Sequence, residues 1–121
     1  MYMANITLLN NQEVLGQEFK VYGDIEEPLF LAKDVAEMIE NKNVSQMLNS
    51  VDEDEKLLYT LYISGQNREM WFLTEDGLYE VLMQSRKPIA KQFKKEIKAI
   101  LKQLRRTGVV ITESATQEAI D

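Results

Sequence analysis

The chain has 121 residues, of which 45% are hydrophobic, and it contains neither cysteine nor histidine. One core is expected at this length, and the two absences exclude disulfides, thiolate metal sites and nucleophiles activated by a histidine base. The net charge of -6 is uneven, because residues 1–85 carry 5 basic and 16 acidic side chains whereas residues 86–106 carry nine basic and one acidic. We therefore expect a basic surface on an acidic body.

Three short strands are predicted first. Apolar and β-branched residues indicate strands at 6–9, 17–21 and 27–31. Turns are expected at the asparagine pair 10–11 and at 22–24, around a glycine. Pro28 limits the third run to an edge strand or to the start of a strand.

Two short helices are predicted next. From residue 32 the apolar side chains fall on one side of a helix of about two turns, and the charged ones cover the other side. Residues 41–43 interrupt this pattern, and 44–51 restarts it with apolar residues three and four apart. Two short helices joined by a polar turn have the outline of a helix-turn-helix.

A β-hairpin and two further helices complete the pattern. An acidic turn at 52–55 precedes a strand at 56–63, a turn at 64–67 and a strand at 69–73, so the hairpin could serve as a wing. Thr74 suits the N-cap of a helix that runs to Gln84. Pro88 suits the first position of a long helix that ends before Gly108. The predicted class is α+β: a small antiparallel sheet with hairpins, a helix-turn-helix-like pair and a long C-terminal amphipathic helix.

The long helix is predicted to carry a cationic stripe. At about 100° per residue, six basic side chains share an arc with Lys91, opposite an apolar face: Lys87, Lys94, Lys95, Lys98, Lys102 and Arg105. Like charges four residues apart repel, and a negatively charged partner would relieve the repulsion. That partner could be a phosphate backbone, an acidic protein or the chain's own run at 52–55; the simpler alternative is a solvated lysine face.

The helix pair offers a second candidate surface. If 44–51 is a recognition helix, its outward polar side chains suit contacts with base edges, and a basic residue just before it suits phosphate: Lys42, Asn43, Ser45, Gln46 and Asn49. The alternative is an ordinary polar helix face. The acidic run at 52–55 would repel phosphate, which counts against insertion into a groove.

Catalysis is not expected. The carboxylate pairs Glu26–Glu27 and Glu75–Asp76 occupy turn or cap positions, and the sequence contains no glycine-rich phosphate loop and no metal-ligand spacing, so no metal site and no cofactor are predicted. The aromatic residues Tyr59, Tyr62, Trp71 and Phe72 are expected to pack in the core or the wing, with exposed base-stacking aromatics as the alternative.

Five blocks carry a family resemblance: 28–36 (PLFLAKDVA), 51–56 (VDEDEK), 72–79 (FLTEDGLY), 85–93 (SRKPIAKQF) and 105–108 (RRTG). In this order they resemble the BRO family N-terminal domain of prophage antirepressors and large DNA viruses. The resemblance implies a role in phage or mobile-element gene control, by binding DNA or by sequestering a repressor, and it implies no catalysis. The family's longer antirepressors carry a second, C-terminal domain, whereas here a short acidic tail follows.

The sequence thus predicts a BRO N-terminal-like domain at 1–108 and a tail or linker at 109–121. The leading hypothesis is a transcriptional regulator that binds DNA through the cationic stripe and the helix pair. The alternative is a protein-interaction module that sequesters a phage repressor without touching DNA. No membrane-length apolar run is present, so the cytoplasm is expected. A homodimer through the apolar face of the last helix is open, although burial within the monomer is the simpler use of that face.

Overall fold

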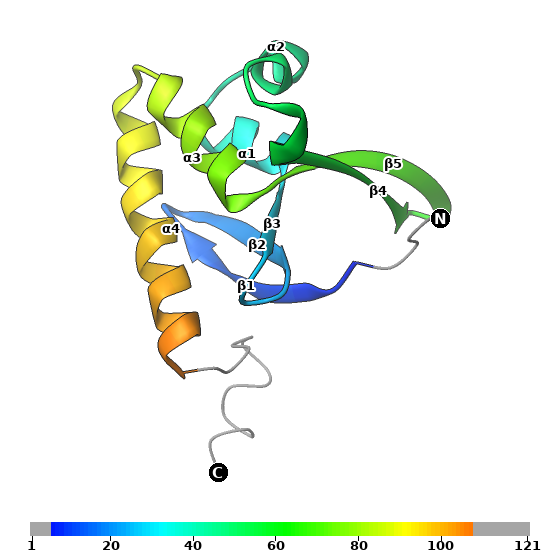
Figure 1. Cartoon of the computed structure of the whole chain (residues 1–121), viewed down its shortest axis with the longest axis horizontal. Helices are drawn as coiled ribbons and strands as arrows, with labels where there is room; N and C mark the ends of the chain where they lie inside the picture. Colours follow the sequence, from blue (N-terminus) through cyan, green and yellow to red (C-terminus); the bar gives the residue numbers. More distant parts are fainter. Residues whose placement is uncertain (1–5, 108–121) are drawn as a thin grey trace.

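The computed structural model describes residues 6–107 (Figure 1). Five strands form one antiparallel sheet in the order β1-β2-β3-β5-β4: β1 (Leu8–Val14), β2 (Gln17–Gly23), β3 (Pro28–Leu31), β4 (Lys56–Ile63) and β5 (Gln66–Leu73). Four α-helices and one 3₁₀ turn accompany it: α1 (Ala32–Met38), α2 (Val44–Asn49), η1 (Glu53–Glu55), α3 (Glu75–Gln84) and α4 (Pro88–Thr107). The predicted α+β class is confirmed. Gly108 and the predicted tail 109–121 lie outside the described residues.

The first hairpin differs from its prediction. Residues 10–11, expected as a turn, lie inside β1, where the strand register shifts between Leu8 and Asn10. The chain reverses instead at Leu15 and Gly16, which have φ of 52° and 83°. Positive φ at both central residues defines the two-residue turn that suits a twisted hairpin. The prediction of a turn at the asparagine pair is wrong because asparagine is favoured both in turns and at irregularities within a strand.

Pro28 is the first residue of β3, which confirms the predicted alternative of a position at the start of a strand. The edge-strand alternative is wrong, because β3 lies between β2 and β5. The preceding turn also comes later than expected. Gly23 still belongs to β2, and the backbone N–H of Glu27 donates to Oδ1 of Asp24 over 2.8 Å to close the turn.

The helical segments follow the prediction closely. α2 stops at Asn49 rather than at residue 51, and the acidic turn predicted at 52–55 is a 3₁₀ turn over Glu53–Glu55. The turn of the second hairpin takes only Ser64 and Gly65, so β5 begins at residue 66 instead of 69. Thr74 caps α3 as predicted, since its Oγ1 accepts from the N–H of Gly77 over 3.1 Å.

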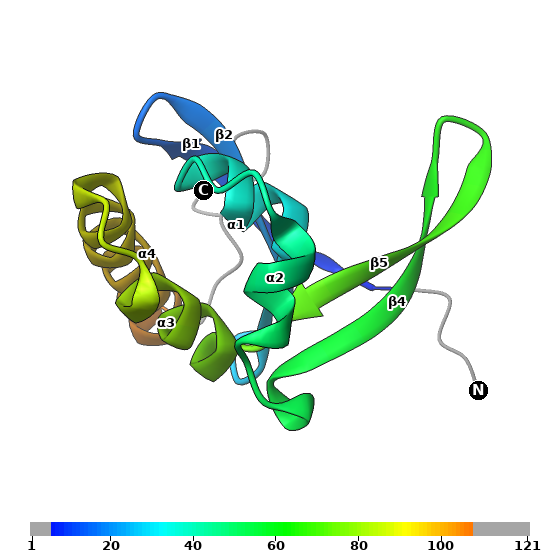
Figure 2. The same ribbon diagram turned by 90° about the horizontal axis from the view of Figure 1, so that it is seen from above.

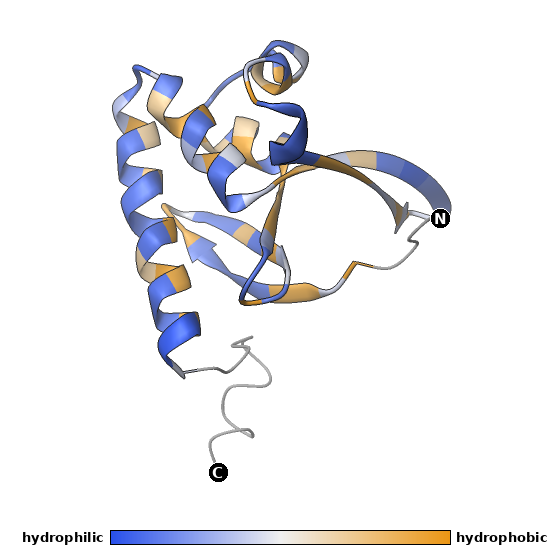
Figure 3. Ribbon diagram, in the orientation of Figure 1, coloured by the Kyte–Doolittle hydropathy of each residue, from blue (hydrophilic) through white to orange (hydrophobic). Residues whose placement is uncertain are grey.

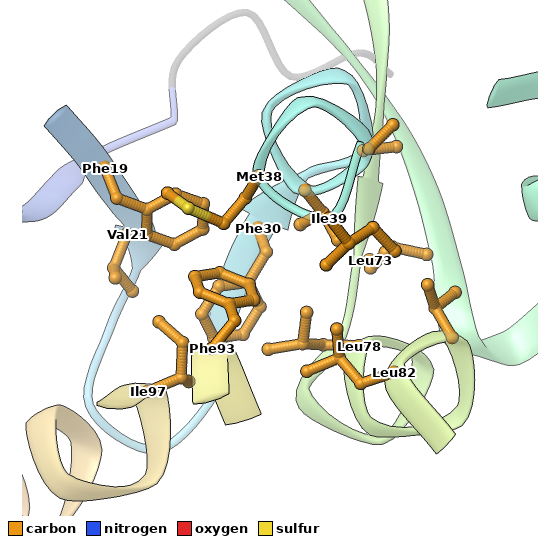
Figure 4. Packing of buried hydrophobic residues seen from close by; sticks show 14 of the residues in the cluster. Phe19, Val21, Phe30, Met38, Ile39, Leu73, Leu78, Leu82, Phe93 and Ile97 are labelled. Carbon is orange, nitrogen blue, oxygen red and sulfur yellow. The ribbon is translucent and has the colours of Figure 1, made fainter. Parts of the chain in front are cut away.

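One buried core joins strands β1, β2, β3 and β5 to all four α-helices. Figure 4 shows its centre, where the ring of Phe93 from α4 meets Phe19 of β2 edge-to-face at 4.9 Å between centroids. Phe30 of β3 also stacks on Phe19, with 6.4 Å between the ring centroids. Five apolar residues of α4 are therefore buried inside the monomer, which is the simpler of the two uses expected for this face.

Helix α3 starts in close contact with η1. The N–H of Thr74 donates to the backbone oxygen of Glu55 over 3.0 Å. A Cβ on Gly77 would lie 2.4 Å from that same oxygen, so only glycine fits where the two turns meet. This contact fixes the acidic run of η1 beside the acidic first turn of α3.

A smaller apolar cluster lies on the opposite face of the sheet. Leu29, Leu31 and Phe72 alternate along their strands with core residues, and Tyr22 and Tyr59 pack edge-to-face on Phe72 at 5.2 and 5.7 Å. The β4–β5 hairpin projects beyond the body from this region, as the view in Figure 2 shows. We call this hairpin the arm.

Candidate nucleic-acid interface

The prediction that residues 88–106 form one unbroken helix is confirmed by α4. Hydrophilic residues run along this helix in Figure 3, interrupted by the hydrophobic ones that enter the core. Most of the predicted stripe is exposed to solvent, and only Lys94 is half-buried. The stripe is therefore continuous over the length of the helix, with its apolar face turned inward.

Arg105, at the end of the stripe, forms hydrogen bonds and a salt bridge with other residues of the same chain. Its Nη2 and Nη1 donate to Oε1 and Oε2 of Glu75 over 2.6 and 3.2 Å, and its Nε donates to the backbone oxygen of Ile25 over 3.2 Å. A bidentate arginine-carboxylate pair of this kind fixes geometry as well as charge. Arg105 thus ties α4 to α3 and to the β2–β3 turn.

Two lysines of the stripe also have internal contacts. Nζ of Lys87 donates to the backbone oxygen of Glu40, just past the end of α1. Nζ of Lys98 lies 6.0 Å from the ring centroid of Tyr79 on α3, within cation–π range. Neither partner is a carboxylate, so neither contact is a salt bridge.

The five stripe lysines within α4 form no salt bridge with the described residues, and we call them the lysine ridge: Lys91, Lys94, Lys95, Lys98 and Lys102. The run 52–55, considered above as an internal partner, does not fill that role in this part of the chain. Its Glu53 instead lies 3.9 Å from Lys56. Glu75, which was predicted only as part of a helix cap, instead forms a salt bridge with Arg105 of the stripe.

Of the polar residues predicted to form a surface on the helix pair, two are hydrogen-bonded to each other and three are not hydrogen-bonded through their side chains within residues 6–107. Asn43 caps α2, since its Oδ1 accepts from the N–H of Gln46 over 3.0 Å and its Nδ2 donates to Oε1 of Gln46 over 3.2 Å. Lys42, Ser45 and Asn49 are exposed, and no side-chain hydrogen bond within residues 6–107 involves them. Of the three amide side chains suited to reading adenine, Asn43 and Gln46 are therefore bonded to each other, and Asn49 is left open.

A cleft of about 570 Å³ connects the helix pair to the start of α4. Lys42 and Gln46 line it from one side, and Lys87 and Gln84 from the other. The structure thus brings together residues from both predicted surfaces that are some 40 positions apart in the sequence. Ser45 and Asn49 are not among the residues that line this cleft.

A second groove, of about 510 Å³, is strongly acidic. It lies where the β2–β3 turn, η1 and the start of α3 meet, and its walls carry seven carboxylates: Glu26, Glu27, Asp52, Asp54, Glu55, Glu75 and Asp76. In the sequence these residues fall in separate turns and helix caps. Only the close packing at Gly77 reveals that three short acidic runs form one surface.

The environment of Glu75 predicts a pH-dependent contribution to stability. Hydrogen bonds from Arg105 are the main cause of its lowered pKa, with burial opposing and the Tyr79 hydroxyl, 3.0 Å away, adding to the lowering. Since the folded pKa lies below the unfolded one, the stabilisation is complete above the ordinary value of 4.5 and disappears as the pH falls through the folded value.

We therefore expect Glu75→Gln to lower the free energy of unfolding by about 1 kcal/mol at pH 7, because solvent still screens this partly exposed pair. Urea denaturation of the variant and the wild type at a series of pH values measures the difference. It should shrink toward zero in acid. Glu96→Gln, an exposed site on α4, is the matched control and should change stability by less than about 0.5 kcal/mol. A difference that stays constant with pH would contradict this role of Glu75.

Within residues 6–107, no group of three or more carboxylate side chains is arranged to hold a metal ion. No helix in that range is both long enough and apolar enough to cross a bilayer.

Comparison with known proteins identifies a family. Residues 18–103 match the model of the BRO family, N-terminal domain. A Bro-N domain-containing protein, 289L of Invertebrate iridescent virus 6, is 26% identical over 140 residues, which cover 99% of this chain but only 32% of that protein. The chain thus spans about a third of the length of this relative, and no solved structure matches it. By the extent of the family match, the chain belongs to the BRO family and represents its N-terminal domain.

Proposed function

We propose that this chain is the DNA-contacting domain of a phage- or virus-type transcriptional regulator of the antirepressor kind, and that it acts by binding rather than by catalysis. The lysine ridge carries the proposal. Its five cations face solvent on one side of α4, without a salt bridge among the described residues, on a body that is otherwise acidic.

The spacing of the ridge suits a phosphate backbone. Lys91 and Lys102 are eleven residues apart, which is about 16 Å along a helix axis and comparable to five steps of B-DNA. Lysines at i and i+4 repel one another, so an idle surface helix usually alternates them with acids. Neutralisation by phosphates removes that repulsion and releases the counterions condensed on DNA.

Base reading is assigned to the exposed face of the helix pair, acting like a helix-turn-helix. Ser45 and Asn49 are open to a base edge, whereas Asn43 and Gln46 must first exchange the hydrogen bonds between them. Lys42 and Lys87 at the cleft would contact the flanking phosphates. We therefore expect contacts with base edges to contribute less to the binding free energy than contacts with phosphates, so the preference for one DNA sequence over another should be weak.

The second candidate is a module that sequesters a phage repressor without contacting DNA. The acidic groove favours it, since the six carboxylates other than Glu75, which already pairs with Arg105, would attract the basic, DNA-facing surface of a repressor. The two candidates use different faces of the domain.

Titration of the domain into fluorescent mixed-sequence duplex at two salt concentrations distinguishes them. We expect binding at about 50 mM salt and a slope of log affinity against log salt of about -4, because each phosphate contact contributes roughly -0.9. A slope near -1 would mean that the ridge is not the contact surface. Undetectable binding at low salt would exclude the DNA proposal and leave the repressor-binding alternative.

A further inference from the structure

The outer strand of the arm has an unprotected edge. β4 is the last strand of the sheet, so in the described part of the chain one side of it pairs with no other strand. Natural edge strands are blunted by charges, prolines or bulges. Residues 57–63 contain no charge and no proline, and their pairing with β5 has no register shift.

The same strand exposes apolar side chains on both faces. Leu58 and Tyr62 on one face are 46% and 74% exposed, and Leu57 and Ile63 on the other are 38% and 36% exposed. The expectation that Tyr62 packs within the core or wing is therefore wrong, whereas Phe72 is fully buried. Among the described residues, the outer backbone edge of β4 pairs with no strand, and these side chains remain largely outside the core.

The hairpin turn determines which backbone groups point outward. Ser64 and Gly65 have φ of 52° and 81°, the two-residue turn whose flanking residues, Ile63 and Gln66, form a hydrogen-bonded pair. Hydrogen-bonded and non-bonded pairs alternate from there. The N–H and C=O groups of Leu58, Thr60 and Tyr62 consequently face the open edge.

We infer that β4 pairs antiparallel with β4 of a second copy, with Thr60 on the two-fold axis, to form a continuous ten-stranded sheet across a homodimer. In this register Leu58 lies opposite Tyr62 of the second copy, and Thr60 faces its own counterpart. On the other face Leu57 meets Ile63, and Tyr59 meets Leu61. Every cross-strand pair is then apolar or threonine–threonine, pairings that stabilise sheets.

The uncharged strand allows a second copy to occupy this edge although the chain as a whole is acidic. The chain carries a net charge of -6, so contact between two acidic bodies is repulsive. The seven uncharged residues of β4 bring no like charges together, and the projecting arm holds the bodies apart (Figure 2). A two-fold contact also requires one surface to be complementary to itself, which an antiparallel strand pair satisfies.

Sedimentation equilibrium of the full chain tests the inference. The wild type should have twice the 14.0 kDa mass of one chain. Thr60→Pro should be monomeric, since it removes an edge donor while the monomer tolerates proline at an outward N–H. Tyr62→Lys, at the most exposed of these sites, should weaken the dimer at least tenfold. Asn67→Lys, the same charge on the cross-strand neighbour in the inner strand, should leave it unchanged.

Cross-linking tests the register. The chain has no cysteine, so Thr60→Cys introduces a single thiol. Hydrogen-bonded antiparallel neighbours have Cα atoms about 5.5 Å apart, within the range for a disulfide. We expect oxidation to yield a covalent dimer from Thr60→Cys and none from Asn67→Cys. A wild type that stays monomeric at every concentration, or a dimer that survives both Thr60→Pro and Tyr62→Lys, would overturn the inference. DNA affinity is a separate measurement on α4, so either proposal can fail alone.

Discussion

Charge reversal at two lysines of the ridge should reduce affinity for mixed-sequence duplex by about 100-fold or more at low salt. The double variant Lys94→Glu, Lys98→Glu removes two phosphate contacts and places two carboxylates against the backbone, a loss of roughly 3 kcal/mol. The fold should survive, because Lys98 is exposed, Lys94 is half-buried and neither forms a salt bridge in the described part of the chain. Fluorescence anisotropy measures the affinity, and circular dichroism checks the fold.

A matched control separates the ridge from net charge. Lys33→Glu, Arg68→Glu makes the same change in total charge on α1 and on the arm, at two exposed sites off α4. We expect this variant to lose less than about tenfold in affinity. Equal losses in the two double variants would show that DNA responds to overall charge alone, and the ridge would then have no special role.

Replacement of Phe93 by alanine should lower the free energy of unfolding by about 4 kcal/mol. The ring is fully buried, packs edge-to-face on Phe19 and anchors α4 to the sheet, so its removal leaves a cavity between layers that cannot readily collapse. This loss is a large fraction of the free energy of unfolding of a typical domain, about 5–15 kcal/mol. The melting temperature should fall by roughly 15 °C. Urea denaturation and calorimetry measure both quantities.

The neighbouring exposed residue provides the control for this prediction. Gln92→Ala, one position away on the solvent side of α4, should change stability by less than about 0.5 kcal/mol. DNA binding by Phe93→Ala should fall in proportion to the unfolded fraction and recover on cooling, because the ridge itself is intact. A loss below about 1 kcal/mol would mean that α4 does not dock on the sheet as described.

The elements that the sequence predicted well are those with long or unambiguous periodicity. α4 and β4 agree with their predicted ranges because twenty and eight residues carry a consistent pattern, and Thr74 caps α3 through local chemistry alone. The turns were less certain. The asparagines at 10–11 resembled a turn, while the actual reversal occurs at Leu15 and Gly16.

The lysine ridge is a property of the sequence, because every member lies on one helix and a helical period is enough to align them. The acidic groove and the cleft that unites Lys42 with Lys87 depend on tertiary structure, since they join segments whose distances no local pattern encodes. The same is true of the pairing of Arg105 with Glu75 and of the open edge of β4. Local periodicity determines what one element presents, and packing between distant elements determines which charges are neutralised and which edges stay exposed.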